Sequence, residues 1–318
     1  MAALRFSSGD PAADRRADYA EQFAARGDVE AAIEVLAGAL ELVPGWAAGW
    51  FRLGEFQEMA GQIEAAASAW DRAVALDPED ACGASLKRDL ARATPLVESM
   101  PPAFVELLFD QYAPRFDAAL VNGLGYRGPE ILMQRIAASG FTAAQDVLDL
   151  GCGTGLMGEA IRAFAGRLEG MDISARMLAE ARAKGIYDAL QKRDIARLEA
   201  GPERYDLIVA ADVFAYIGAL EGVIGWCRSA LKAGGVLAFT VEAGGDDDEV
   251  VLRESRRFAH GRGYLAALLA RAGFDGVDIT ECVVRQDRGE NIASLAVVAS
   301  LAPVRHDRAG DDEAQLFA

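Results

Sequence analysis

A short apolar run that ends in a glycine-rich turn constrains the fold of this chain more than any other segment. It reads Val147-Leu-Asp-Leu-Gly-Cys-Gly-Thr-Gly155, and its first residues have the pattern of a buried parallel strand. Residues 156–164 then place their apolar side chains on one helical face. Strand, glycine turn and helix are typical of the start of a doubly wound α/β domain, where a ligand approaches the backbone of the turn closely.

The order of residues in this turn distinguishes two kinds of ligand. Gly153-x-Gly155-x-x-Gly158 formally matches the dinucleotide fingerprint, but the strand already meets a glycine at Gly151. Asp149 lies at the strand end, where a carboxylate repels a diphosphate and attracts an ammonium group. The segment resembles motif I of class I S-adenosylmethionine-dependent methyltransferases, whose cofactor has an ammonium, a sulfonium and no phosphate. The resemblance implies that Asp149, Gly151, Gly153 and Gly155 border this cofactor.

Other segments resemble the same methyltransferases. Asp172 lies 21 residues after Gly151, close to the spacing at which a carboxylate accepts ribose hydroxyls, and it begins an Asp-Ile-Ser-x-x-Met-Leu run. The resemblance makes Asp194 an acceptor for the adenine amino group, although the residues alone indicate a helix cap equally well. It also implies cofactor contacts from Tyr112, Ile173, Met177, Ile195 and Ala211. Tyr112, Phe116 and Asp117 resemble a Tyr-x-x-x-Phe/Tyr-Asp segment that folds over the cofactor in small-molecule methyltransferases of this class.

Candidate acceptor contacts follow the fourth and fifth predicted strands. His260 is one of two histidines, and its position suits a general base that takes a proton from the acceptor. A structural role for this histidine is the alternative. Arg257 or its neighbour Arg256 is predicted either to pair with a substrate carboxylate or to face water, and Tyr216 and Tyr264 are further candidate substrate contacts. No Asn-Pro-Pro-Tyr run follows the fourth strand, which disfavours methylation of bases or glutamine.

The N-terminal third contains a repeat with a period of 34 residues. The residues that recur at this spacing are Ala32 and Ala66, Leu36 and Trp70, Ala39 and Ala73, and Pro44 and Pro78. The period resembles that of tetratricopeptide repeats. We place two repeats at 13–46 and 47–80 and a third helix near 81–93. The repeats either bind a partner, which includes self-association, or pack on the rest of the chain, and the sequence favours neither.

Charge and composition exclude several classes of function. The net charge is −17, and residues 1–100 alone hold 9 basic and 17 acidic side chains, so no broad basic surface is available for nucleic acid. No apolar run has membrane-spanning length, and the N-terminus lacks the order of a signal peptide, so we expect a cytoplasmic protein without a membrane partner. The four cysteines lack paired spacing, which predicts reduced thiols and no metal site.

These observations predict an α/β protein with a Rossmann-like class I methyltransferase fold, a seven-stranded mixed sheet whose last strand is antiparallel. An all-α repeat domain precedes it. The predicted boundaries are 1–95 for the repeats, 96–135 for a linker and cofactor lid, 136–302 for the methyltransferase domain and 303–318 for a disordered tail. We expect methyl transfer from S-adenosylmethionine to an oxygen or nitrogen of a small-molecule acceptor. The alternatives are a protein substrate docked on the repeats, or a non-catalytic scaffold.

Overall fold

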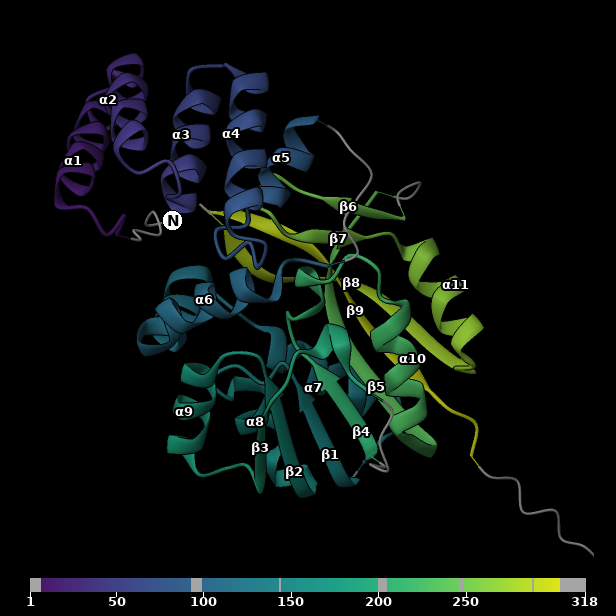
Figure 1. Cartoon of the computed structure of the whole chain (residues 1–318). Helices are drawn as coiled ribbons and strands as arrows, with labels where there is room; N and C mark the ends of the chain where they lie inside the picture. The colour runs from purple at the N-terminus through teal and green to yellow at the C-terminus, as the bar shows by residue number, and fades with distance from the viewer. Residues whose placement is uncertain are drawn as a thin grey trace, which may run out of the picture.

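The computed structural model describes residues 7–92, 99–142, 144–199, 205–245, 249–287 and 289–303. A row of helices forms the N-terminal part, and a twisted sheet with helices on its faces forms the C-terminal part (Figure 1). The predicted tail lies outside the described residues from 304 onward, and so does the linker segment 93–98. The predicted domain boundaries therefore stay predictions.

Five helices form the N-terminal row. They are α1 (Pro11–Ala25), α2 (Val29–Leu42), α3 (Ala47–Met59), α4 (Ile63–Leu76) and α5 (Ala84–Arg92). Small residues let neighbouring helices approach: a Cβ atom added at Gly54 of α3 would lie 2.4 Å from Trp70 Nε1 of α4. The same indole N–H donates to the Phe51 carbonyl at 3.1 Å. The two helix pairs occur where the 34-residue period predicts them.

Helix α5 attaches the repeats to the C-terminal part. Leu86 of α5 is fully buried in an apolar cluster with Phe104 and Phe258 from the C-terminal part. Leu90 packs against the same cluster. Of the two hypotheses for the repeats, packing on the rest of the chain is thus observed, while partner binding stays a prediction.

The predicted mixed sheet is confirmed. Its strands are β1 (Ala144–Leu150), β2 (Ala165–Asp172), β3 (Ala189–Lys192), β4 (Tyr205–Ala210), β5 (Leu231–Ala243), β8 (Gly276–Asp287) and β9 (Glu290–Ser300). The order β3-β2-β1-β4-β5 is parallel, β9 lies antiparallel beside β5, and β8 pairs with β9. All carboxyl ends of the parallel strands therefore lie at one edge, which is where such sheets bind ligands.

A short hairpin adds two strands to the seven predicted ones, so the sheet has nine strands within the described residues. It consists of β6 (Val250–Leu252) and β7 (Phe258–His260), and β7 runs parallel to the end of β5. Three-residue strands are too short to show an alternating pattern, which is why the sequence did not predict them. The turn of the hairpin, residues 253–257, leads into β7 and lies beside the last part of β5, where Arg257 pairs with Glu242.

Helices cover both faces of the sheet (Figure 1). The flanking helices are α7 (Gly128–Ala138), α8 (Leu156–Ile161), α9 (Ala175–Lys184), α10 (Glu221–Ala230) and α11 (Arg262–Ala272). Helices α10 and α11 contribute to one apolar core, and α7 and α8 contribute to another. Helix α6 (Pro102–Tyr112) and the helical turns after it, up to Gly123, precede the sheet in the chain. No helix in the described ranges is long and apolar enough to cross a membrane.

Candidate active site

A cavity of about 710 Å³ lies at the carboxyl ends of the parallel strands. Asp149, Asp172 and Ala211, from the ends of β1, β2 and β4, line one side, and α6 with the turns after it lines the other. This volume is in the range of small-molecule and cofactor sites. In the part of the chain that the structure describes, no group of three or more His, Cys, Asp or Glu side chains could hold a metal ion.

The glycine turn after β1 needs its glycines for two reasons. Gly151 and Gly153 have φ values of +73° and +53°, a region that side chains disfavour. A Cβ atom on Gly151 would also lie 2.1 Å from Val213 Cγ2, which no packing could accommodate without movement. The amides of Gly151 and Cys152 both donate to the Met171 carbonyl, at 2.7 and 2.9 Å. These bonds fix the turn to the end of β2.

Asp172 holds the glycine turn and the start of α9 together. Its Oδ2 atom accepts from the Gly153 amide at 2.9 Å, and its Oδ1 atom accepts from the Ser174 amide at 2.8 Å. Each carboxylate oxygen can accept a further hydrogen bond. Burial raises the pKa of Asp172 to about 6, against the hydrogen bonds that favour the charged form. The side chain lines the cavity, as the ribose role predicted for it requires.

Asp149 lies deeper in the cavity wall. The Tyr187 hydroxyl donates to its Oδ2 atom at 2.6 Å, whereas its buried Oδ1 atom has no partner among the described residues. Burial raises the pKa of this carboxyl to about 7. An unpartnered carboxylate oxygen suits a cationic ligand group, but this atom is shielded from solvent. Its contact with a cofactor ammonium therefore stays a prediction.

The predicted adenine contacts gather at the end of β3. Asp194 and Ile195 line the cavity together with Ile173. Asp194 Oδ1 also accepts from the Ala196 amide at 3.0 Å and caps a short helical turn. The cap and the cavity wall are thus compatible, because the carboxylate has a second oxygen that can accept from a ligand.

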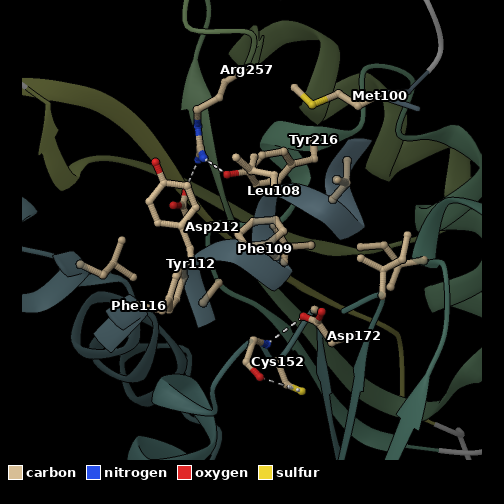
Figure 2. A pocket seen from close by; sticks show the side chains of 18 of the residues that line it. Met100, Leu108, Phe109, Tyr112, Phe116, Cys152, Asp172, Asp212, Tyr216 and Arg257 are labelled. Carbon is tan, nitrogen blue, oxygen red and sulfur yellow. Dashed lines mark hydrogen bonds and ion pairs between the residues drawn. The ribbon is translucent and has the colours of Figure 1, made fainter. Parts of the chain in front are cut away.

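Aromatic side chains cover the cavity. Phe109 contacts Phe116 and Tyr216 edge to face, with ring centroids 6.0 and 5.2 Å apart. Figure 2 shows Phe109, Tyr112 and Phe116 between Asp172 on one side and Arg257 on the other.

The cover is bound to the strand ends that it faces. Ser174 Oγ donates to Asp110 at 2.6 Å, and Thr154 Oγ1 donates to Asp117. The predicted lid residue Tyr112 therefore lies in a segment that is fixed over the cavity.

Charged residues form the end of the cavity opposite the glycine turn. Arg257 donates to Asp212 and Tyr216 (Figure 2) and also to Glu242. Asp212 has a φ of +58°, an uncommon backbone conformation for a residue other than glycine, and its amide donates to Thr240 Oγ1 at 2.8 Å. The prediction that Tyr216 and Arg257 lie near the acceptor end is consistent with this arrangement.

Sequence reasoning missed three residues here, Asp212, Glu242 and Arg285. Glu242 gave a usable signal, because it is a charged residue in the mostly apolar second half of strand β5 and such residues are rarely buried without a partner. Arg285 gave no such signal, because only the pairing of β8 with β9 shows that this residue lies near the cavity.

Three predicted contacts do not line the cavity. Gly155 precedes α8 and faces Tyr187, whose ring lies 3.1 Å from a Cβ atom placed there. Met177 is buried within α9. Tyr264 accepts from the Leu220 amide and donates to Glu221, both at 3.0 Å. None of these three residues is among those that border the cavity. Each of them takes part in the packing around it.

The position of His260 does not fit its predicted role as a general base. Its side chain is fully buried and lies outside the cavity lining. Its Nε2 atom lies 3.1 and 2.9 Å from the carbonyl oxygens of Ile217 and Gly218, so Nε2 carries a hydrogen and donates to both. Burial lowers the pKa of the imidazole. We therefore correct the assignment: His260 ties β7 to the loop after β4 as a neutral structural residue.

Replacing His260 by alanine is expected to destabilise the protein by about 1–3 kcal/mol, because two buried carbonyl groups lose their donor. The affinity for S-adenosylhomocysteine should stay unchanged. Thermal unfolding and calorimetry on one preparation measure both quantities, with His260→Gln as the control that retains an N–H donor. An alanine variant of full thermal stability that had lost methyl transfer would restore the catalytic role.

Comparison with known proteins relates both parts of the chain to families. A model described as "Methyltransferase domain" matches residues 148–237, and one described as "Tetratricopeptide repeat" matches residues 23–90. The chain is 30% identical over 179 residues to a malonyl-[acyl-carrier protein] O-methyltransferase of Enterobacter lignolyticus, a match that covers 55% of this chain and 68% of that protein. It is 25% identical over 112 residues to a ubiquinone biosynthesis O-methyltransferase of Burkholderia ambifaria, covering 33% of this chain and about half (47%) of that protein.

Solved structures of similar fold include two with a bound product of methyl transfer. Magnesium protoporphyrin IX methyltransferase from Synechocystis, with bound S-adenosylhomocysteine, has 18% identity and a TM-score of 0.48, covering 63% of this chain and 99% of that one. The N-methyltransferase NodS from Bradyrhizobium japonicum, in complex with the same compound, has 23% identity and a TM-score of 0.45, covering 54% and 85%.

Proposed function

This chain belongs to the class I S-adenosylmethionine-dependent methyltransferases that carry an N-terminal tetratricopeptide repeat, and on that premise we propose that it methylates an oxygen or nitrogen of a small-molecule acceptor. One observation carries the proposal. A single cavity of about 710 Å³ extends from the glycine turn to Tyr216 and Arg257, so cofactor and acceptor have room in one space. The non-catalytic scaffold alternative predicts an occluded site, which this cavity disfavours.

The residues at the glycine-turn end fit the cofactor. Asp172 keeps acceptor capacity on both oxygens and would receive the ribose hydroxyls. Asp194 and Ile195 would hold the adenine ring, and Gly153 leaves the turn open, since a Cβ atom there would meet nothing nearer than Phe116 at 4.0 Å. When bound, S-adenosylmethionine supplies an electrophilic methyl group on a sulfonium.

The protein's contribution to the reaction would be alignment. Phe109, Tyr112 and Phe116 cover the cavity and would exclude water from it. No histidine lines the described part of the cavity, so no imidazole is in place to take a proton from the acceptor. Holding the acceptor in line with the methyl group is then the main source of rate acceleration.

The cofactor assignment predicts selective binding. Calorimetry at pH 8 should show that the full-length protein binds S-adenosylhomocysteine and S-adenosylmethionine, with little heat from NAD, because Asp149, whose pKa is about 7, is charged there and repels a diphosphate. Heat-denatured protein is the control. Tight binding of NAD without binding of S-adenosylhomocysteine would contradict the assignment.

The protein-substrate alternative needs a test that leaves the repeats in place. Deleting residues 1–95 also removes Leu86, which is buried against Phe104 and Phe258, so a truncated chain would lose packing together with any docking site. Small acceptors that turn over on the full-length chain favour the proposed function.

A further inference from the structure

Two buried arginines meet at the acceptor end of the cavity. Arg257 and Arg285 both line it, and their side chains are only 11% and 9% exposed. Glu242 Oε1 accepts from Arg257 Nε at 2.5 Å and from Arg285 Nη2 at 2.8 Å. Asp212 lies between the same two guanidinium groups, since Arg257 donates to its Oδ1 atom and Arg285 Nε lies 3.6 Å from its Oδ2 atom.

A third arginine lies beside this cluster. Arg253 also pairs with Glu242, with Nη1 and Oε2 3.3 Å apart, so three arginines share the two carboxylates of Asp212 and Glu242. The two buried arginines are matched by two largely buried carboxylates, and the additional positive charge belongs to Arg253, whose side chain is 35% exposed. Solvent screens this outer charge, so the site would recognise an anion chiefly through the hydrogen-bond donors of Arg257 and Arg285.

Two other acids border this cavity near the hairpin and the end of β8. Glu254 is exposed and Asp287 is half-buried, so solvent screens both from the guanidinium groups. No ion pair between either acid and Arg257 or Arg285 occurs within the described ranges.

Hydrogen-bond donors also remain available. Arg257 uses three of its five N–H groups, on Glu242, Tyr216 and Asp212. No described residue accepts from Arg285 Nη1. Planar guanidinium groups with spare N–H donors match a carboxylate in geometry as well as in charge.

We propose that Arg257 and Arg285 together bind a carboxylate group of the methyl acceptor. The proposal rests on the proposed function, because it assigns the chemical class of the acceptor in that same cavity. It selects Arg257 over its neighbour: the Arg256 guanidinium lies 5.1 Å from the Phe104 ring, outside the cavity lining. Arg285 reaches the same site from β8, a strand that the sequence analysis did not connect with it.

The test compares acids with their amides on the full-length protein saturated with S-adenosylhomocysteine. The probes are octanoate and 4-phenylbutyrate, each with the matching primary amide, titrated by calorimetry. At least one acid should bind about tenfold or more tightly than its amide. Replacing Arg285 by methionine should weaken binding of that acid about 10- to 100-fold and leave the amide unaffected.

Arg262→Met is the control, because it removes an exposed arginine that does not border the cavity, and it should leave the preference for the acid unchanged. If Arg285→Met does not fold, Arg285→Lys keeps the charge without the planar fork and should lose part of the preference. Equal binding of acids and amides to the wild type, or an unchanged preference in the folded Arg285 variant, would overturn the proposal. Binding of S-adenosylhomocysteine, measured first, reports separately on the proposed function.

Discussion

Replacing Asp172 by alanine is expected to weaken binding of S-adenosylhomocysteine about 10- to 100-fold. The carboxylate would accept the ribose hydroxyls, and hydrogen bonds to charged groups are worth about 1.5–3 kcal/mol. It also holds the Gly153 and Ser174 amides, so its removal loosens the turn that borders the cofactor. Calorimetry measures the effect, with the exposed Asp275 replaced by alanine as control. Unchanged affinity in a folded Asp172 variant would refute the ribose role.

The pKa of Asp172 adds a pH signature to this prediction. Burial raises that pKa to about 6, and ribose hydroxyls donate to the charged form, so cofactor binding expels the proton. The affinity should therefore be full above about pH 7 and fall as the pH drops through 6. Asp149, whose pKa burial raises to about 7, titrates in the same window. Asp172→Asn removes only the Asp172 component, and an unaltered pH profile in that variant would argue against it.

Gly151→Ala is expected to destabilise the protein by about 2–5 kcal/mol and to abolish measurable cofactor binding. A side chain at a φ of +73° costs about 1–2 kcal/mol, and overpacking against Val213, 2.1 Å from the new Cβ, costs about 1–3 kcal/mol. Moving either partner displaces the turn that borders the cavity. Chemical denaturation and calorimetry measure the two effects.

Two further variants separate the causes of this loss. Gly151→Ala combined with Val213→Ala removes most of the overlap and should recover part of the stability, while the backbone strain remains. Gly153→Ala has a φ of +53° but no atom nearer than Phe116 at 4.0 Å, so its stability loss should be the smaller. A Gly151→Ala protein as stable as the wild type would show that the turn is not constrained as described.

The cofactor end of the cavity could be predicted from the sequence because its residues follow strands directly. Gly151 and Gly153 continue from β1, and Asp172 ends β2, so a short local pattern contains both the strand and the contact. The acceptor end could not be predicted in this way. Glu242, Arg257 and Arg285 come from three segments that meet only through the pairing of β5 with β7 and β9 and of β8 with β9.

The incorrect predictions for His260 and Tyr264 have the same physical origin. Both follow the fifth strand, in the region where doubly wound sheets bind ligands, but His260 belongs to strand β7 of the hairpin and Tyr264 belongs to helix α11. The Tyr264 ring stacks on His260 with centroids 6.0 Å apart, and both anchor neighbouring loops by hydrogen bonds to the backbone. A residue near the carboxyl edge of the sheet therefore contacts a ligand only if its side chain also points into the cavity, and the sequence alone does not give that direction.

The attachment of α5 to the C-terminal part limits which segments of this protein can be exchanged for those of another protein. One loop, residues 253–257, carries Arg257 into the cavity while Arg256 lies against Phe104 in the region where α5 is anchored. Exchanging the helical repeats for those of another protein would change the support of this loop. A chimaera that is to keep its choice of acceptor must therefore inherit α5 and the hairpin as one unit.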